Sequence, residues 1–445
     1  SETEPQYSSL SRGILRLCFT LRCMSRGVRA AEPAQLHVRL PEIVMSRILF
    51  SPESFNMGET TRCIEIARVA RERGHTVLFH VYSPKYLGLL ESAGLPVHLR
   101  EPIMSDAEAE QIMALDQGRG VRHPFTTDMV RRRVTAELAA IRDFSADAVV
   151  IGSNLTMLLS ARIAGVPIFY ARPYAYSSTY FSKKPVDGEL AAPGWLRAVA
   201  RVLSYKPASF TRVAREHGLR LPRRTLDMLS ADVNLICSLF TQLRGDSLVE
   251  PDVGVGPIYY RAPGELPQIV REPRERPLIY VGMGSSGSAD ILAQVLQQLS
   301  AAPVDVLVGG GVQLSDTSKL GSNIHFAGTV PGTIPAHLLA GHIDASMTHG
   351  GEGTVQTACL AGVPFAGIAM QAEQSWNIEE CVRYGNALRF TKNDVRRGNV
   401  RDILGRLLSD EDMRARARQL GEAMRTMDGA ALAVEKIEDY LRAPR

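Results

Sequence analysis

The order of its predicted elements is the feature that most constrains the fold of this chain of 445 residues. Short apolar runs rich in β-branched residues alternate with segments whose apolar residues recur every three or four positions. RILFSP, near the start, is followed by the amphipathic segment ETTRCIEIARVARERG, which ends at Gly74, and then by HTVLFHVYS. Strands and helices that alternate in this way form a parallel sheet covered by helices. Further strands are predicted at Ala146–Gly152, Val166–Ala171 and Val233–Ser238.

The alternation pauses and then restarts. Residues 251–277 are rich in proline and show little helical periodicity, which is typical of an interdomain linker. They are followed by the strand PLIYVGMG, the helix SADILAQVLQQLSAA, and the strands VDVLVGGG, IHFAGTV and IDASMTH. The sequence therefore predicts two tandem doubly wound α/β domains, at residues 45–250 and 278–425. Residues 426–445 are expected to form a helix that packs back on the first domain. Ligands of such folds bind beyond the carboxyl ends of the strands, which makes a deep interdomain cleft the expected site.

Residues 1–44 precede the first predicted strand and show no strong periodicity. The apolar segment Ile14–Leu21 is too short to span a membrane and is interrupted by Arg16, so it is a poor signal sequence. We expect a leader that is disordered or a non-native extension, with a membrane-surface anchor as the alternative. No other apolar run approaches a membrane span, so no stable membrane insertion is expected.

Composition restricts the classes of partner. A net charge of +4 on a chain of this length does not favour a nucleic-acid partner. The six cysteines are scattered, and no CxxC pair or histidine cluster indicates a zinc site. Such cysteine usage fits a reducing, cytoplasmic location.

The segment MTHGGEGTVQTACLAGVPF, residues 347–365, carries the strongest chemical signal. Its glycines, Gly350, Gly351 and Gly353, are predicted on a turn between a strand and a helix. Glycine there lets the backbone approach a ligand, and the first amides of the helix favour an anion such as phosphate. His349 and Thr354 are placed to donate hydrogen bonds to the same anion. The alternative is that the glycines only tighten the turn.

A second turn of this type lies in VGMGSSGSAD, where Gly284, Ser285 and Ser286 follow the first strand of the second domain. Two anion-suited turns that face one cleft suit a diphosphate, although neither matches a P-loop. Downstream, GIAMQAEQSWN offers Glu373, Gln374 and Asn377 after another strand. A carboxylate beside carboxamides can bind the vicinal hydroxyls of a sugar. The alternative is a polar cluster at the start of a helix.

Together, THGGEGTVQTACLAGVPF and AMQAEQSWN resemble the donor-binding signature of the family 1 glycosyltransferases of the bacterial antibiotic and plant natural-product type. Those enzymes have the GT-B fold, with two Rossmann-like domains. The similarity extends over the second domain, where YVGMGSSG and FAGTVP also resemble family segments, and it is looser in the first.

The resemblance implies roles for named residues. His349, Gly351 and Thr354 are expected to contact the diphosphate of the donor, with Ser285 or Ser286 assisting. Thr329–Pro331, which include Val330, fall near the nucleotide base. Glu373 and Gln374 stand where the family has an Asp-Gln pair that holds sugar hydroxyls. Glu373 is one methylene longer than that aspartate, and Ala369 replaces a usual proline.

The base position departs further from the family pattern. Family members usually carry Gly-His in the loop before the first helix, and the histidine removes the proton of the acceptor hydroxyl. Here the pair aligned by the downstream RGH is Gly58-Glu59. The later strand, where the family has an orienting aspartate, ends in Gly152, Ser153 and Asn154. Both changes fit a carboxylate base. A carboxylate has no tautomer for an aspartate to hold, and a second carboxylate beside it would raise one of the two pKa values, so replacement of the orienting aspartate is expected. The alternative is that Glu59 only begins a helix and that Asp106 or Asp128 is the base.

The inferred reaction is an in-line displacement. Glu59 takes the proton of a hydroxyl on a small natural-product or antibiotic-like acceptor, and that oxygen attacks the anomeric carbon of a UDP- or TDP-sugar with inversion. Each preorganised donor on the leaving diphosphate contributes about 2 to 4 kcal/mol. We therefore predict a metal-independent, inverting glycosyltransferase of the hexosyltransferase type, with no cofactor, acting as a monomer or homodimer. A non-catalytic nucleotide-sugar-binding partner of another transferase, or a sugar-nucleotide epimerase of similar fold, is the alternative.

Overall fold

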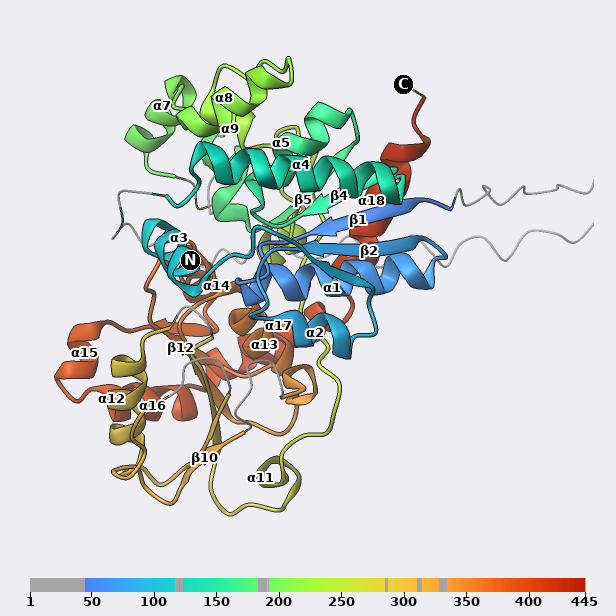
Figure 1. The fold of residues 1–445 in the computed structure, drawn as a ribbon. Helices are drawn as coiled ribbons and strands as arrows, with labels where there is room; N and C mark the ends of the chain where they lie inside the picture. The colour runs from blue at the N-terminus through green and yellow to red at the C-terminus, as the bar shows by residue number, and fades with distance from the viewer. Residues whose placement is uncertain are drawn as a thin grey trace, which may run out of the picture. The chain divides into compact units, whose positions relative to one another are not determined.

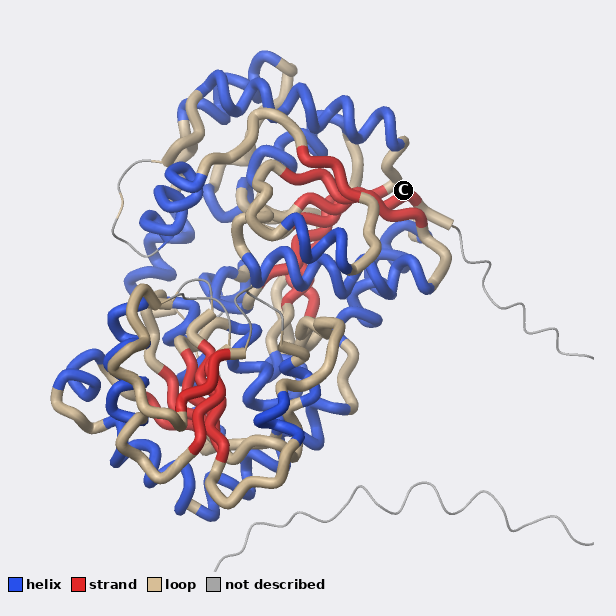
Figure 2. Tube along the Cα trace, turned by 60° about the horizontal axis from the view of Figure 1, so that its bottom comes forward, coloured by secondary structure: helices blue, strands red, loops and turns tan. Residues whose placement is uncertain are grey.

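A computed structural model describes residues 45–116, 120, 123–182, 190, 192–284, 287–309, 314–327 and 334–444 of the chain. Within residues 45–444, two parallel sheets are each flanked by helices, and Figure 2 shows them as two separate groups of strands. We refer to the first sheet with its helices as the first lobe and to the second as the second lobe. The predicted fold class, two tandem α/β units, is confirmed.

The first sheet has the order β3-β2-β1-β4-β5-β6-β7, and all of its neighbouring strands are parallel. Leu49 pairs with Leu78 on one side and with Val149 on the other. Each of the longer strands is almost entirely buried, as expected for a sheet covered on both faces. The strands are β1 (Arg47–Ser51), β2 (Thr76–Val81), β3 (Val97–Leu99), β4 (Ala148–Ile151), β5 (Ile168–Arg172), β6 (Val233–Ile236) and β7 (Asp252–Gly254).

The second sheet has the order β10-β9-β8-β11-β12-β13 and is also parallel throughout. In both sheets the chain order reverses beside the first strand of the lobe, β1 or β8. Ligand sites of doubly wound folds form at such points. The strands are β8 (Leu278–Gly282), β9 (Asp305–Val308), β10 (Ile324–Phe326), β11 (Ala345–Thr348), β12 (Phe365–Gly367) and β13 (Ala387–Arg389).

The helices lie around the sheets (Figure 1). In the first lobe they are α1 (Met57–Glu72), α2 (Leu87–Ser92), α3 (Asp106–Asp116), α4 (Thr127–Phe144), α5 (Leu155–Ala164), the 3₁₀ turn η1 (Tyr174–Tyr176), α6 (Ser178–Ser182), α7 (Gly194–Val202), α8 (Ala208–Glu216), α9 (Thr225–Met228) and α10 (Leu239–Arg244). They continue with α11 (Gln268–Arg271), α12 (Ala289–Leu299), η2 (Ala336–Leu338), α13 (Glu352–Ala361), α14 (Ala372–Tyr384), α15 (Lys392–Arg396), α16 (Val400–Ser409), α17 (Glu411–Arg425) and α18 (Gly429–Arg442).

The ends of α1 illustrate why the sequence forms these elements. Asn56 precedes the helix with extended backbone angles, and its side chain accepts hydrogen bonds from the amides of Gly58 and Glu59. Gly74 follows the helix with φ +93°, a conformation that costs glycine little. The buried face of α1 packs on the sheet through residues such as Ile64 and Ile66. The helix therefore starts at a fixed point beside the end of β1.

The last helix, α18, packs against α1 in the first lobe. Glu438 accepts hydrogen bonds from Arg73 at 3.1 Å and pairs with the ring of His75 at 3.0 Å. The ring of Tyr440 meets that of Phe169 edge to face. The end of the chain thus returns to the lobe in which the described residues begin.

Two details differ from the sequence interpretation. The predicted linker 251–277 is not uniformly irregular, because it begins with β7, the seventh strand of the first sheet. The strands β3 and β13 were not predicted; each has only three residues, too few to show a period.

Among the described residues, none of the helices combines the length and the apolar composition needed to cross a bilayer.

Candidate functional site

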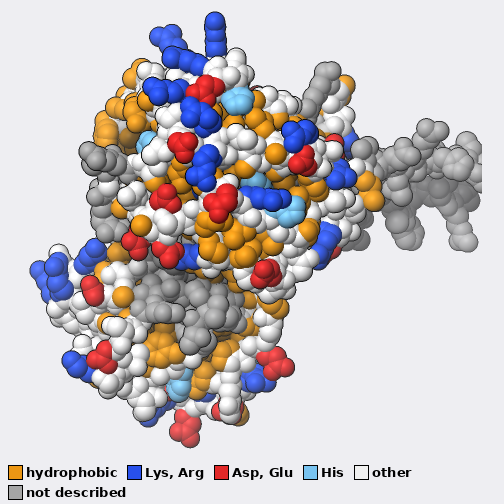
Figure 3. All heavy atoms as spheres, viewed as in Figure 1, with side chains coloured by type: hydrophobic (Ala, Val, Ile, Leu, Met, Phe, Trp, Pro, Cys, Tyr) orange, Lys and Arg blue, Asp and Glu red, His pale blue; other side chains and the backbone are white. Residues whose placement is uncertain are grey.

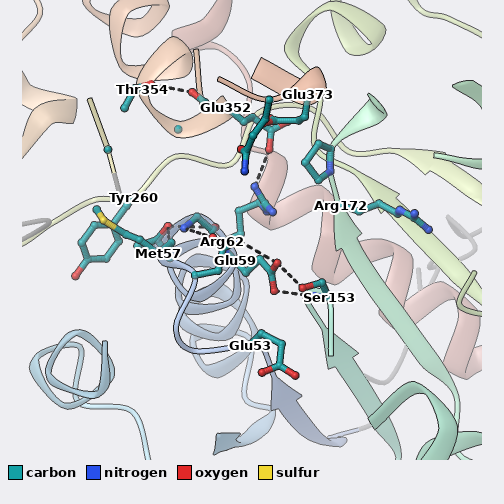
Figure 4. A pocket seen from close by; sticks show the side chains of 18 of the residues that line it. Glu53, Met57, Glu59, Arg62, Ser153, Arg172, Tyr260, Glu352, Thr354 and Glu373 are labelled. Carbon is teal, nitrogen blue, oxygen red and sulfur yellow. Dashed lines mark hydrogen bonds and ion pairs between the residues drawn. The ribbon is translucent and has the colours of Figure 1, made fainter. Parts of the chain in front are cut away.

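A cavity of about 490 Å³ lies where the carboxyl ends of the two sheets meet (Figure 4). The first lobe lines it with the loops that follow β1, β4 and β5. The second lobe lines it with the turns that follow β8, β11 and β12. The cavity therefore occupies the predicted cleft between the two α/β units.

His349 follows β11 and is held between the two glycine turns. A Cβ atom at Gly284 would lie 2.4 Å from its Cε1 atom, and one at Gly351 would lie 2.5 Å from its Nε2 atom. Gly284 also has φ +56°, which disfavours any other residue. Both glycines are therefore required by their contact with one imidazole ring, which lines the cavity.

The imidazole of His349 is neutral. Burial lowers its pKa to about 4, because the charged ring would lose its hydration. Its Nδ1 atom is buried without a hydrogen-bond partner among the described residues. A neutral ring carries one N–H donor, which is suited to an oxygen anion without adding a permanent charge.

The first turn of α13 has amides available for a ligand. Gly351 is the residue before the helix. The amides of Gly351, Glu352 and Gly353 donate hydrogen bonds to no acceptor among the described residues. The hydroxyl of Thr354 donates to the carbonyl of Gly351 at 2.8 Å, which fixes its side chain beside the cavity. Such a helix start, with unpaired amides, attracts an anion.

The other two glycines of this turn, Gly350 and Gly353, differ from Gly351 in what a Cβ atom would meet. Gly350 has φ +85°, and a Cβ atom there would lie 2.6 Å from Ile378. Gly350 is absent from the cavity lining, so it serves the turn and its packing. A Cβ atom at Gly353 would meet no atom within 4 Å, although Gly353 does line the cavity.

Glu352 forms a buried ion pair with Arg62 across the cavity. The Nη1 atom of Arg62, on α1, lies 2.8 Å from Oε2 of Glu352, and both side chains are more than nine-tenths buried. Burial raises the pKa of Glu352 to about 7, and the charge of Arg62 offsets only part of that effect. This pair was not predicted from the sequence, because nothing in a sequence signals a contact between residues 290 positions apart.

Of the three sugar-binding candidates, only Glu373 lines the cavity. Glu373, in the first turn of α14, lines the cavity and accepts a hydrogen bond from Asn377 at 2.5 Å. Asn377 also donates to the carbonyl of Gly350 at 3.0 Å, which ties α14 to the glycine turn. Gln374 is fully buried and accepts from the amide of Met370. Gln374 and Asn377 therefore lie behind the cavity wall, and Gln371 lines the cavity beside Glu373.

Glu59 faces the same cavity from the first lobe. Its carboxylate accepts hydrogen bonds from the amide of Ser153 at 2.7 Å and from the hydroxyl of Ser153 at 2.6 Å (Figure 4). Gly152 lies directly beneath, and a Cβ atom there would be 2.3 Å from Oε2 of Glu59. The strand end that lacks the family's aspartate thus holds Glu59 in one orientation.

Burial raises the pKa of Glu59 above its ordinary value. The hydrogen bonds from Ser153 and the charge of Arg62 lower the pKa by less than burial raises it. A second carboxylate, Glu53, adds a smaller upward effect. Glu53 lines the cavity but is engaged by the fully buried Arg133 at 2.7 Å. Asp106 and Asp128, the alternative bases, are exposed and lie outside the cavity lining.

The first lobe gives the cavity an apolar part. It is formed by Phe55, Met57, Ile112, Met113, Phe125 and Leu229, with the aromatic rings of Tyr170, Tyr176 and Tyr260 nearby. Among the other predicted site residues, Ser285, Ser286 and Val330 lie outside the described residues. The groups of His, Cys, Asp and Glu in the described part of the chain include none that is arranged to hold a metal ion.

Comparison with known proteins shows which proteins this chain is similar to. Residues 293–439 match the domain described as erythromycin biosynthesis protein CIII-like, C-terminal domain. The chain is 26% identical over 398 residues to a PGL/p-HBAD biosynthesis glycosyltransferase of Mycobacterium tuberculosis, a match that spans 85% of this chain and 88% of that protein. Over most of its length, this chain is similar to glycosyltransferases of the antibiotic and natural-product type, and it has their GT-B fold.

Solved structures of glycosyltransferases share the fold of this chain. Spinosyn forosaminyltransferase SpnP superimposes with a TM-score of 0.66 at 16% identity, covering 89% of this chain and 100% of SpnP. Glycosyltransferase VinC in complex with DTDP gives a TM-score of 0.65 at 16% identity, covering 89% of this chain and 99% of VinC. The resemblance stated from the sequence is confirmed, and so is the fold that it implies.

Proposed function

We propose that this glycosyltransferase moves a sugar from a nucleotide-diphosphate donor to a hydroxyl of a small, largely apolar acceptor, with inversion at the anomeric carbon. One observation carries the proposal: a held carboxylate, Glu59, and an unpaired helix start beside His349 line one cavity from opposite lobes. The first suits an acceptor hydroxyl and the second suits a leaving diphosphate.

In this proposal the donor lies against the second lobe. The amides that start α13 and the N–H of His349 bind the diphosphate oxygens, and Glu373 with Gln371 meets the hydroxyls of the sugar. The complex of VinC with DTDP supports TDP as the first nucleotide to try, with UDP next. Because the amides and neutral imidazole stabilise the charge of the leaving group, the proposal needs neither metal nor cofactor.

The acceptor lies against the apolar wall of the first lobe, with its hydroxyl at Glu59. Glu59 removes the hydroxyl proton as the oxygen forms its bond to the anomeric carbon. The bond from that carbon to the diphosphate breaks, and the electron pair leaves with the diphosphate. Ser153 keeps the carboxylate directed at the reacting oxygen, as an orienting residue does for a histidine base.

The raised pKa of Glu59 gives the proposal a pH signature. A base must be ionised, and Glu59 loses its charge as pH falls through its raised pKa. We therefore expect kcat to fall toward acid at a pH above that of an ordinary glutamate. In Glu59→Gln this acid limb should disappear from the remaining activity.

The direct test compares Glu59→Gln with the wild type. The donors are TDP-, UDP- and GDP-sugars, each with a panel of phenolic and alcoholic acceptors, and the product configuration is read by NMR. The expected result is an inverted glycoside and a fall in kcat of roughly 10²- to 10⁴-fold in the variant, with donor affinity unchanged. Glu72→Gln, at the exposed far end of α1, is the matched control.

Other outcomes would redirect the proposal. Turnover by Glu59→Gln at the wild-type rate would rule out Glu59 as the base. Donor binding without turnover on any acceptor would favour a non-catalytic partner role. Conversion of the donor sugar without an acceptor would favour an epimerase.

A further inference from the structure

The helix α7 and the residues after it carry a concentration of exposed apolar side chains in the first lobe. Trp195 is 69% exposed, Val202 77%, Tyr205 62% and Val199 44%. These four belong to the segment GWLRAVARVLSYKP, residues 194–207. Exposed apolar residues are normal when scattered singly, but a contiguous group indicates an interaction surface.

The helix has two apolar faces with different environments. Ala200 is buried and Leu196 is half-buried, so this face packs inward against the lobe. Trp195, Val199 and Val202 are spaced four and three residues apart, which places them on one outward face. Packing within the described part of the lobe therefore does not account for the outward face.

The flanks of the outward face are positively charged. Arg197 and Arg201 lie one turn apart beside it, Lys206 follows, and residues 192–208 contain no aspartate or glutamate. Figure 3 shows hydrophobic side chains at the upper left edge, where Figure 1 places α7, with Lys and Arg side chains above them. We define residues 194–206 as the α7 patch.

We propose that the α7 patch docks the enzyme on a bilayer surface that contains anionic lipid. An amphipathic helix with tryptophan on its apolar face and Arg or Lys beside it can lie in the interface of a bilayer. Tryptophan and tyrosine favour the headgroup level, and the basic side chains are attracted to anionic headgroups. The charge also disfavours a second copy, since a two-fold contact would bring the same guanidinium groups together.

The position of the α7 patch bears on the acceptor, a consequence that rests on the proposed function. α7 contacts α6 and α9. α6 begins just after Tyr176, and α9 ends just before Leu229, and both of these residues line the cavity. A docked first lobe would therefore hold its acceptor side close to amphiphilic acceptors in the bilayer.

The test uses the full chain with vesicles of phosphatidylglycerol and phosphatidylcholine in equal parts, and with vesicles of phosphatidylcholine alone. We expect co-sedimentation with the anionic vesicles and weaker binding as salt is added. The chain has two tryptophans, and Trp376 is only 7% exposed. A blue shift of the emission on docking would therefore report Trp195 entering an apolar environment.

Two variants separate the apolar and the charged contributions. Trp195→Ser with Val202→Ser should abolish most of the co-sedimentation. Arg197→Glu with Lys206→Glu should weaken binding to anionic vesicles by roughly 25-fold or more, since each basic residue near such a surface contributes about fivefold. Phe326→Ser, at an exposed apolar residue of the second lobe, is the matched control and should bind like the wild type.

Three results would overturn the proposal: no binding to anionic vesicles, binding that Trp195→Ser with Val202→Ser leaves unchanged, or concentration-dependent dimers without vesicles that this variant abolishes. Circular dichroism confirms that each variant is folded. Because the vesicle assay contains neither donor nor acceptor, its failure leaves the transferase proposal intact, and the reverse also holds.

Discussion

The two lobes present the same structural feature to the cavity in two chemically different forms. Each places the start of a helix after a sheet strand, α1 after β1 and α13 after β11. At α1 the side chain of Asn56 accepts hydrogen bonds from the amides of Gly58 and Glu59, so these two donors are already satisfied. At α13 glycine precedes the helix, and the amides of Gly351, Glu352 and Gly353 have no acceptor among the described residues.

This difference explains how one fold can serve two chemical roles. A helix start that a side chain has capped does not need an anion. At α1 the carboxylate of Glu59 lines the cavity instead. A helix start without a cap retains its donors, so α13 is suited to the anion that leaves. Arg62 and Glu352 join the two helix starts through their ion pair (Figure 4).

After Glu59→Gln, the largest effect is expected from His349→Ala. If the imidazole donates to the leaving diphosphate, its loss should lower kcat by about 10²- to 10³-fold, the usual effect of one preorganised donor. Steady-state kinetics with a TDP-sugar donor measures the change. His217→Ala, at an exposed histidine of the first lobe, should leave kcat unaltered. A full-rate His349→Ala enzyme would mean that the donor diphosphate does not meet this ring.

A smaller effect, on the pH dependence of the free energy of unfolding, is expected from Glu352→Gln, which alters the ion pair that joins the two helix starts. The folded pKa of Glu352 is raised to about 7, above its unfolded value, so the folded state holds the proton more tightly. This stabilisation is fully present at acid pH and is lost as pH rises through about 7. Between pH 5 and pH 8, the free energy of unfolding of the wild type should fall by up to about 3 kcal/mol more than that of Glu352→Gln.

Urea unfolding at several pH values measures that difference. Glu411→Gln, at an exposed acid in the first turn of α17, is the control and should follow the wild type. Parallel pH curves for Glu352→Gln and the wild type would show that this carboxyl does not take up a proton in the range.

The smallest effect is expected from Asn56→Ala, which removes the side-chain cap of α1. The loss should cost about 1 kcal/mol in the free energy of unfolding. Ser288→Ala is a sharp comparison, because Ser288 precedes α12 without making a side-chain cap hydrogen bond. Equal costs for both substitutions would contradict the assignment of Asn56 as the cap.

The sequence was sufficient for the fold because the relevant signals are local. The alternation of RILFSP, the α1 pattern and HTVLFHVYS reports a parallel sheet directly, and Gly74 marks the end of the helix. The strand β7 escaped prediction because its three residues lie among prolines in the segment interpreted as a linker. Register and strand order needed the structure.

The candidate site could be predicted only in part, for a similar reason. His349, Gly351 and Glu59 were found because their motifs are contiguous. Arg62 and Glu352 were not found, although Glu352 stands inside the glycine motif, since their pairing joins two lobes. Gln374 and Asn377 share a motif with Glu373, yet only the structure shows that they lie behind the cavity wall.

The most direct test of the account is calorimetric titration of thymidine diphosphate into the wild type, Gly351→Ala and Gly405→Ala. A Cβ atom at Gly351 would displace the ring of His349, whereas one at Gly405, on α16, meets no atom within 4 Å. The account predicts binding by the wild type and Gly405→Ala, and affinity at least about tenfold weaker for Gly351→Ala, a loss of about 1.4 kcal/mol. Equal affinity in all three proteins, or no heat from the wild type with thymidine, uridine or guanosine diphosphate, would contradict it.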